Sequence, residues 1–191
     1  MNAQPPIVSF KSAKAWEDYL LKNYNSEPGI WMRLAKKSSG ESTINHEEAL
    51  IVALMFGWID GQAKTIDENF WQIKFTPRRK NSIWSKRNCE IVERLIKVKK
   101  MKPSGLAQVE AAKQDGRWEK AYDSPKNMNV PEDFLKELEK DKNALEFFKS
   151  LNKSNTYAIA WRLQTAKKPE TRARRMKVLL EMLSREEKLY P

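Results

Sequence analysis

The chain has 191 residues, of which 40% are hydrophobic and 10% aromatic, enough to build a core in one domain or in two small ones. No apolar run approaches the roughly 18 residues that span a bilayer, and the first nine residues lack the basic and apolar regions of a secretory signal. The formal net charge is +11, and the single cysteine and single histidine exclude an internal disulfide and leave a zinc site of the usual kind without ligands. We therefore expect a cytoplasmic protein that uses no cofactor and does not insert into a membrane.

The positive charge is concentrated in two segments. Residues 71–102 hold eleven Lys and Arg against two Glu, a local balance of +9. Residues 161–179 hold seven against one, a balance of +6, so the rest of the chain is net acidic (11 − 15 = −4). Such concentration is typical of a surface that attracts a polyanion, and a solvated face that only improves solubility explains it equally well.

The chain opens with a helical pattern followed by a strand pattern. Ser12 can cap a helix whose apolar residues recur at helical spacing, and residues 25–29 close it. Strict alternation of apolar side chains over 30–35 then predicts a strand.

A buried helix and a hairpin come next. Asn45, with Glu48 three residues later, predicts a capping arrangement for a helix over 45–57 that is apolar almost all round. After it, residues 58–66 are rich in strand formers, and residues 71–76 alternate apolar and polar side chains. These two runs predict a hairpin.

A long basic helix and a shorter helix complete the first half. The shorter helix begins at Pro103 and carries Leu106 and Val109. With about three strands, these helices predict an α+β domain over 1–118, its sheet small and antiparallel. The apolar stripe expected on the basic helix consists of Trp84, Ile91, Leu95 and Val98.

The second half is expected to be entirely helical. Residues 116–129 lose periodicity and are rich in turn formers, which predicts a linker, placed at 119–129. An all-α module of three shorter helices and a final helix should occupy 130–191, with Pro169 in the first turn of the last helix. The buried stripe expected on that last helix is Ala173, Met176, Leu180 and Leu183.

Two groups of residues carry a recognisable pattern. The first combines GWIDGQ at 57–62 with FTPRR at 75–79 and WSKRN at 84–88, and the second is AKKPETRARR at 166–175. Together they resemble the YdeI/OmpD-associated family over nearly the whole chain, the second group being similar to that family's C-terminal helical module. The resemblance implies a context of bacterial stress or bacteriocin protection and names no reaction. The first half is also distantly similar to the YjbR-type α+β domains.

Two aspartates could divide acid and base roles. Asp60 and Asp67 lie on or beside the predicted hairpin, but their spacing does not show that they converge. The structural interpretation has Asp60 bonding turn amides or an arginine and Asp67 shaping the turn. Ser85 has no identifiable base, because the only histidine, His46, is remote in sequence, so a Ser-His-Asp hydrolase is not expected. No catalytic residue and no metal ligand is predicted.

A richer set of side chains surrounds the hairpin and the start of the basic helix. Arginines offer paired donors to phosphate or carboxylate, tryptophans offer stacking faces, and a helix start offers backbone amides. The alternative is that Trp58 and Trp84 are core residues that clamp the hairpin to the helix. The predicted ligand-binding residues are Trp58, Asp60, Gly61, Lys64, Phe75, Thr76, Arg78, Arg79, Trp84, Ser85, Lys86 and Asn88.

A second cluster of cations lies on and just before the last predicted helix. A helix face with several cations suits phosphate contacts or an acidic protein, and a solvated or internally paired face is the equal alternative. The predicted polyanion-binding residues are Lys167, Lys168, Arg172, Arg174, Arg175 and Lys177.

The sequence thus predicts a non-enzymatic protein that binds an anionic partner, either nucleic acid or an acidic protein. The resemblance adds the stress or bacteriocin-tolerance context. A different hypothesis is a sensor or enzyme for a small anionic metabolite, held by the pocket around Asp60 and Arg78, with Asp60 or Lys64 as the acid or base.

Overall fold

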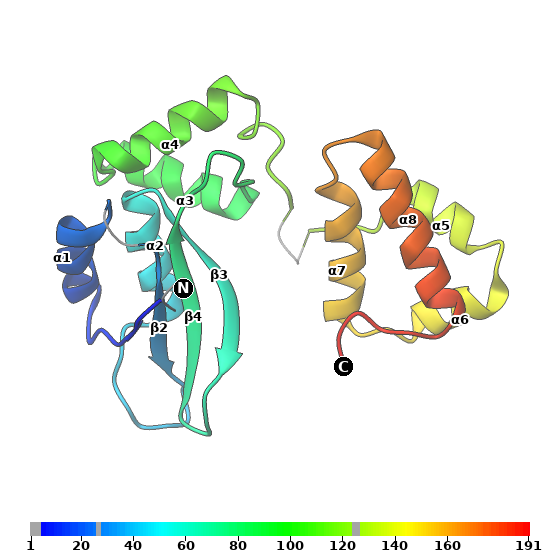
Figure 1. Cartoon of the computed structure of the whole chain (residues 1–191), viewed down its shortest axis with the longest axis horizontal. Helices are drawn as coiled ribbons and strands as arrows, with labels where there is room; N and C mark the ends of the chain where they lie inside the picture. Colours follow the sequence, from blue (N-terminus) through cyan, green and yellow to red (C-terminus); the bar gives the residue numbers. More distant parts are fainter. Residues whose placement is uncertain (1–4, 26–27, 124–126) are drawn as a thin grey trace. The chain divides into compact units, whose positions relative to one another are not determined.

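The computed structural model describes residues 5–25, 28–123 and 127–191, and the chain divides into two compact units, Met1–Ala121 and Tyr122–Pro191 (Figure 1). The first unit mixes helices with a sheet and the second consists of helices, so the predicted α+β fold class is confirmed. Two predictions reach beyond the described residues. The segment expected to close the first helix includes residues 26–27, and the expected linker includes residues 124–126.

The first unit is built on a four-stranded sheet in the order β1-β2-β4-β3. β1 (Ile7–Val8) pairs in parallel with β2 (Ile30–Ala35), β2 pairs antiparallel with β4 (Phe70–Pro77), and β4 pairs antiparallel with β3 (Trp58–Thr65). The expectation of about three strands in an antiparallel sheet is therefore corrected at one edge. The two-residue β1 is too short to leave an alternating pattern in the sequence.

Four helices accompany the sheet, and the two predicted N-caps are present. Ser12 accepts a hydrogen bond from the amide of Ala15, and Asn45 forms a capping box with Glu48. Each cap satisfies amides that the first helical turn leaves unpaired. The helices of this unit are α1 (Ala13–Asn23), α2 (His46–Met55), α3 (Lys86–Lys97) and α4 (Pro103–Gln114).

One face of the sheet carries the core. Ile30, Met32 and Leu34 of β2 are buried, because their alternation points all three into the core cluster that also includes buried residues of α1 and α2. Trp16 of α1 fixes this packing, since its indole nitrogen donates to the Ala49 carbonyl oxygen of α2 and its ring lies 5.8 Å from that of Phe75 in β4. The alternate residues of the strands therefore point to the opposite face.

The apolar stripe predicted for the basic helix, α3, needs correction. Trp84 precedes α3, and Val98 is 60% exposed because it caps the C-terminus of that helix. Leu106 of α4 is 41% exposed, since α4 turns its small residues inward. The helix approaches α2 so closely that a Cβ atom at Gly105 would lie 2.2 Å from the carbonyl oxygen of Met55.

The second unit packs four helices around one core. They are α5 (Glu132–Leu138), α6 (Lys142–Lys149), α7 (Lys153–Gln164) and α8 (Pro169–Ser184). The stripe predicted for α8 is wrong at Ala173, which is exposed, because only the C-terminal half of the helix enters the core. The buried residues of α8 are Leu179, Met182 and Leu183. Of the helices that the structure describes, none has the length and apolar character to cross a membrane.

Candidate functional site

Most aromatic and arginine residues of the predicted ligand site lie in the core of the first unit. Trp58 and Trp84 are each 1% exposed, and Phe75 is fully buried. Trp58 donates from its indole nitrogen to the carbonyl oxygen of Tyr24, and the Trp84 ring lies 4.8 Å from that of Trp118. These rings therefore pack against other core side chains and offer no exposed stacking face.

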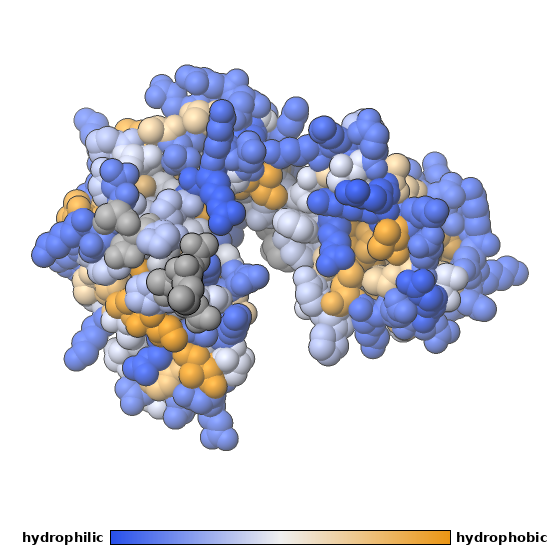
Figure 2. Space-filling model, in the orientation of Figure 1, coloured by the Kyte–Doolittle hydropathy of each residue, from blue (hydrophilic) through white to orange (hydrophobic). Residues whose placement is uncertain are grey.

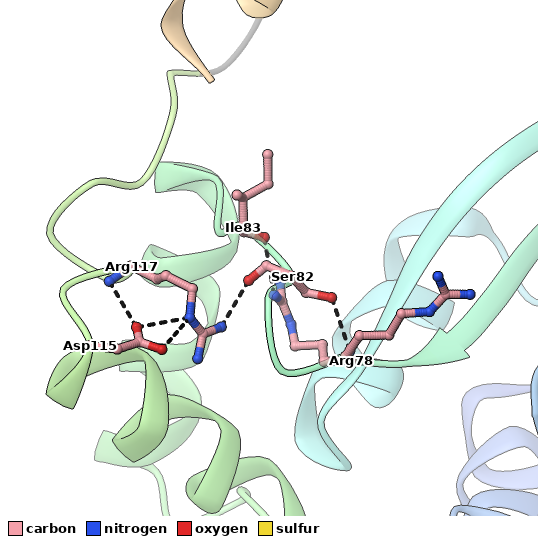
Figure 3. A network of polar contacts seen from close by, with 6 residues as sticks. Arg78, Ser82, Ile83, Asp115 and Arg117 are labelled. Carbon is pink, nitrogen blue, oxygen red and sulfur yellow. Dashed lines mark hydrogen bonds and ion pairs between the residues drawn. The ribbon is translucent and has the colours of Figure 1, made fainter. Parts of the chain in front are cut away.

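Arg78 is also buried, and it holds a loop in place (Figure 3). Its guanidinium carbon lies 3.5 Å from the centroid of the Trp84 ring, and its Nη1 atom donates to the carbonyl oxygen of Ile83. Arg117, oriented by Asp115, donates to the carbonyl oxygen of Ser82 from the other side. Arginines thus fasten the loop over residues 79–83 through its carbonyl groups.

The remaining members of the predicted site have local roles or are exposed. Ser85 caps α3 by accepting a hydrogen bond from the amide of Asn88, so this amide is already used. The side chain of Thr76 packs on Gly29, where a Cβ atom would lie 2.7 Å from the Thr76 Cγ2 atom. The exposed members are Gly61, Lys64, Arg79 and Lys86.

Asp60 and Asp67 have separate partners. Asp60 pairs with His46, the first residue of α2, at 2.9 Å between Oδ2 and Nε2. This pair joins α2 to β3 and corrects the expectation that Asp60 would bond turn amides or an arginine, because nothing in the sequence indicates that Asp60 and His46 meet. Asp67 accepts from the amides of Asn69 and Phe70 and shapes the turn between β3 and β4, which is the role expected of it. Among the described residues, no group of His, Cys, Asp and Glu could hold a metal ion.

The second face of the sheet gathers aromatic rings under cations. The Arg33 guanidinium carbon lies 4.4 Å from the centroid of the Phe70 ring, and the Lys64 ammonium nitrogen lies 5.0 Å from that of Trp31. The strand register places Lys74 beside Trp31 on the same face. Both rings are half-buried, and neither belongs to the core cluster of the described first unit. We call Trp31, Arg33, Lys64, Phe70, Gln72 and Lys74 the open sheet face.

The charge of the open sheet face is entirely positive. Among the described positions that the register places on this side of β1 to β4, none is acidic. Gln72 lies between Arg33 and Lys64 in the register, and its Oε1 atom is buried without a hydrogen-bond partner in the described part of the chain. The neighbouring Ile7 of β1 is 61% exposed. Figure 2 shows hydrophobic patches among hydrophilic groups on the surface of the first unit.

The prediction named only Lys64 of these six residues. The strand alternation could have identified this face, because it places Trp31 and Arg33 on the side of β2 opposite to the core residues. The predicted site contained Trp58 and Trp84 instead, and both are buried.

The predicted polyanion cluster of the second unit is partly paired. Arg172 donates two hydrogen bonds to Asp133, and Arg175 donates to the carbonyl oxygen of Arg162. Lys177 lies 3.8 Å from Glu181. Within this cluster, the exposed cations with no partner in the described part of the chain are Lys167, Lys168 and Arg174.

Fold and surface together define a two-unit α+β protein whose first unit exposes a basic, aromatic sheet face. Just over half of the chain, residues 8–108, matches a domain of unknown function (DUF8412). Residues 127–186 match the family described as "Bacteriocin-protection, YdeI or OmpD-Associated". The chain therefore belongs to the DUF8412 family. The predicted YdeI/OmpD-associated relationship is confirmed over residues 127–186, whereas the motifs of the first half fall within the DUF8412 match. No curated protein and no solved structure matches the chain. The similarity to YjbR-type domains stays a prediction.

Proposed function

We propose that the first unit binds single-stranded nucleic acid on its open sheet face. The observation that carries the proposal is the placement of Trp31 and Phe70 beneath Lys64 and Arg33, on a face with no carboxylate among its described residues. Bases stack on exposed aromatic rings with about 1–3 kcal/mol each, and cations beside the rings hold the phosphates.

Other features of the face support the same ligand. Lys74 adds a third cation beside Trp31. An acidic protein would use the cations and leave the rings with no particular role, so the aromatic content favours nucleic acid over the other anionic partner considered.

The metabolite hypothesis around Asp60 and Arg78 gains no support from the geometry. Arg78 is 6% exposed and lies over the Trp84 ring, while Asp60 is engaged with His46. The context of bacteriocin protection is a proposal that rests on the description of the matched family alone.

The test is binding of fluorescently labelled oligonucleotides of about 12 residues at about 50 and 200 mM salt. Single-stranded DNA or RNA should bind, and the affinity should fall steeply as salt rises. Trp31→Ala and Phe70→Ala should each weaken binding about 5- to 100-fold, whereas Trp31→Phe, which keeps a stacking ring, should retain most of it. Arg33→Ala should also reduce the slope of log affinity against log salt concentration by about one.

The matched control is Arg94→Ala, which removes an exposed cation on α3 of the same unit and should change the affinity little. Circular dichroism of each variant establishes that it is folded. Unchanged affinity in folded Trp31→Ala and Phe70→Ala would contradict the proposal. Equal binding of an acidic polypeptide, insensitive to both ring variants, would favour the protein partner instead.

A further inference from the structure

The second unit contains a cavity of about 360 Å³ with an unusual lining. This volume lies in the range of small-molecule sites in proteins, about 300–1,000 Å³. The lining consists of Tyr122, Tyr157, Ala158, Trp161, Arg162 and Tyr190. Four aromatic rings and one guanidinium group thus face a single space, and none of these residues belongs to the sites predicted from the sequence.

The floor of the cavity is one face of α7. Tyr157, Ala158, Trp161 and Arg162 follow the spacing i, i+1, i+4 and i+5, which places them along one side of a helix. Leu163 and Ile159 point the other way into the core of the unit. The rigid, buried side of α7 therefore fixes the position of the ring and cation that line the cavity.

The two walls are the first and last segments of the unit, and each is tied to α7. Tyr122 meets the Trp161 ring edge to face, at 6.1 Å between centroids. Next to it, the amide of Asp123 donates to the Gln164 side chain, which donates back to the Asp123 carboxylate.

The other wall, Tyr190, is held by a buried asparagine. Asn155 is 1% exposed, and its Oδ1 atom accepts from the amides of Leu189 and Tyr190. Its Nδ2 atom donates to the carbonyl oxygen of Tyr190 and to Asn152. A buried side chain whose polar atoms are all satisfied orders the segment that it binds, so this wall is organised before any ligand arrives.

Two polar side chains of the cavity, Arg162 and Tyr157, are available to a ligand. In the described part of the chain, the Arg162 guanidinium has no hydrogen-bond or ion-pair partner, although its backbone carbonyl accepts from Arg175. The Tyr157 hydroxyl likewise has no hydrogen-bond partner among the described residues, and burial raises its pKa, so it is a neutral donor at physiological pH. The nearby carboxylate, Asp123, is engaged with Gln164.

The charge decides which ligand the rings suit. Aromatic cages without a cation bind quaternary ammonium groups, but Arg162 and the adjacent Arg175 would repel such a ligand. Rings favour a flat partner through stacking, and a guanidinium with free donors favours a phosphate or carboxylate. We infer that this cavity binds a flat aromatic ring that carries an anionic group, as in a nucleoside monophosphate or an aromatic carboxylate.

The inference is independent of the open sheet face, and the experiment uses the full chain. Calorimetric titrations with adenosine monophosphate and with indole-3-acetate test the two kinds of ligand, a nucleoside monophosphate and an aromatic carboxylate. Adenosine and indole are the controls that have the ring without the anionic group. Choline is the control for a cationic ligand. Saturable binding of at least one anionic ring, about tenfold or more tighter than its neutral counterpart, is the expected result.

Variants assign the binding to the cavity. Arg162→Gln should remove the preference for the anionic ring, and Trp161→Ala should weaken both members of the pair. Arg174→Ala, which deletes an exposed cation on α8, is the matched control and should leave binding unchanged. If Trp161→Ala fails to fold, the half-exposed Arg162→Gln still decides the outcome.

The inference is overturned if no anionic ring binds, if neutral rings or choline bind equally well, or if Arg174→Ala has the effect of Arg162→Gln. Trp31→Ala separates the two proposals. It should abolish stacking on the open sheet face and leave the titration of the second unit unaltered, so either proposal can fail without the other.

Discussion

The guanidinium group of Arg78 lies over the indole of Trp84, with 3.5 Å from its central carbon to the ring centroid. Both residues come from the segment that the sequence marks as a basic, aromatic ligand site. Their burial gives them a different task, because the pair closes the core beneath the loop over residues 79–83. The next residue, Arg79, is exposed and gives a neighbour of the same type for comparison.

Arg78→Ala should therefore destabilise the first unit by about 2–3 kcal/mol, because it removes a desolvated cation–π contact and a hydrogen bond from a charged donor. Arg79→Ala should change the free energy of unfolding by less than about 0.5 kcal/mol. Urea unfolding followed by tryptophan fluorescence measures both, since six of the seven tryptophans lie before residue 122. Equal effects of the two substitutions would argue against the clamp.

The close approach of α4 to α2 makes a second prediction. Gly105→Ala places a methyl group at 2.2 Å from the Met55 carbonyl oxygen, so the helices must separate, at a cost of about 1–3 kcal/mol. Gly61 on the edge strand β3 is the control, because its nearest neighbour would be 3.7 Å from a Cβ atom. Gly61→Ala should leave the urea midpoint nearly unchanged. An unchanged urea midpoint in Gly105→Ala would show that α4 can move away from α2 at little cost.

Local patterns were sufficient for most secondary structure. Ser12 and the pair Asn45 and Glu48 were assigned as helix caps from their spacing to the following residues, because a cap is a contact within one turn. The alternation in β2 likewise separated its core residues from Trp31 and Arg33. These features depend on neighbours in the sequence.

The candidate sites depend on contacts between distant segments. The burial of Trp58 involves Trp16 of α1, and that of Trp84 involves Trp118 beyond α4, so the residues next to each tryptophan in the sequence do not predict its burial. The cavity of the second unit brings Tyr122 and Tyr190 together on α7 from the two ends of that unit. The residue pattern within a single helix or strand does not predict a contact between segments so far apart in the sequence.

The bidentate pair between Arg172 and Asp133 predicts a pH effect on the second unit. The hydrogen bonds from Arg172 lower the pKa of Asp133 in the folded protein. The pair therefore stabilises the fold above the ordinary aspartate pKa of about 3.9, and this contribution is lost as the pH falls through that value toward the lowered one.

Asp133→Asn should reduce stability at neutral pH and flatten the acid limb of the stability curve. Glu132→Gln removes a charge from the same exposed turn of α5 and should preserve that limb. Thermal unfolding of the variants between about pH 2 and 7 follows the effect. An unaltered acid limb in Asp133→Asn would show that the pair contributes nothing measurable, as is common for exposed ion pairs.

The single thiol should be inert while the protein is folded. Burial raises the pKa of Cys89 to about 12, although the charge of Arg78 opposes the shift. Because the thiolate is the reacting species, modification by a disulfide reagent at about pH 8 should be at least about 1,000-fold slower than for the unfolded chain. The rate should also keep rising beyond pH 9, where an ordinary thiol reaches its plateau.

The same shift destabilises the fold in alkali. The unfolded thiol ionises near pH 8.5 and the folded one does not, so the stability present below that pH decreases as the pH rises toward the folded pKa. Cys89→Ala should remove this part of the alkaline slope, after allowance for the lost packing of the side chain. Rapid modification of the native protein, with a plateau near pH 9, would mean that the thiol is reached by solvent without unfolding.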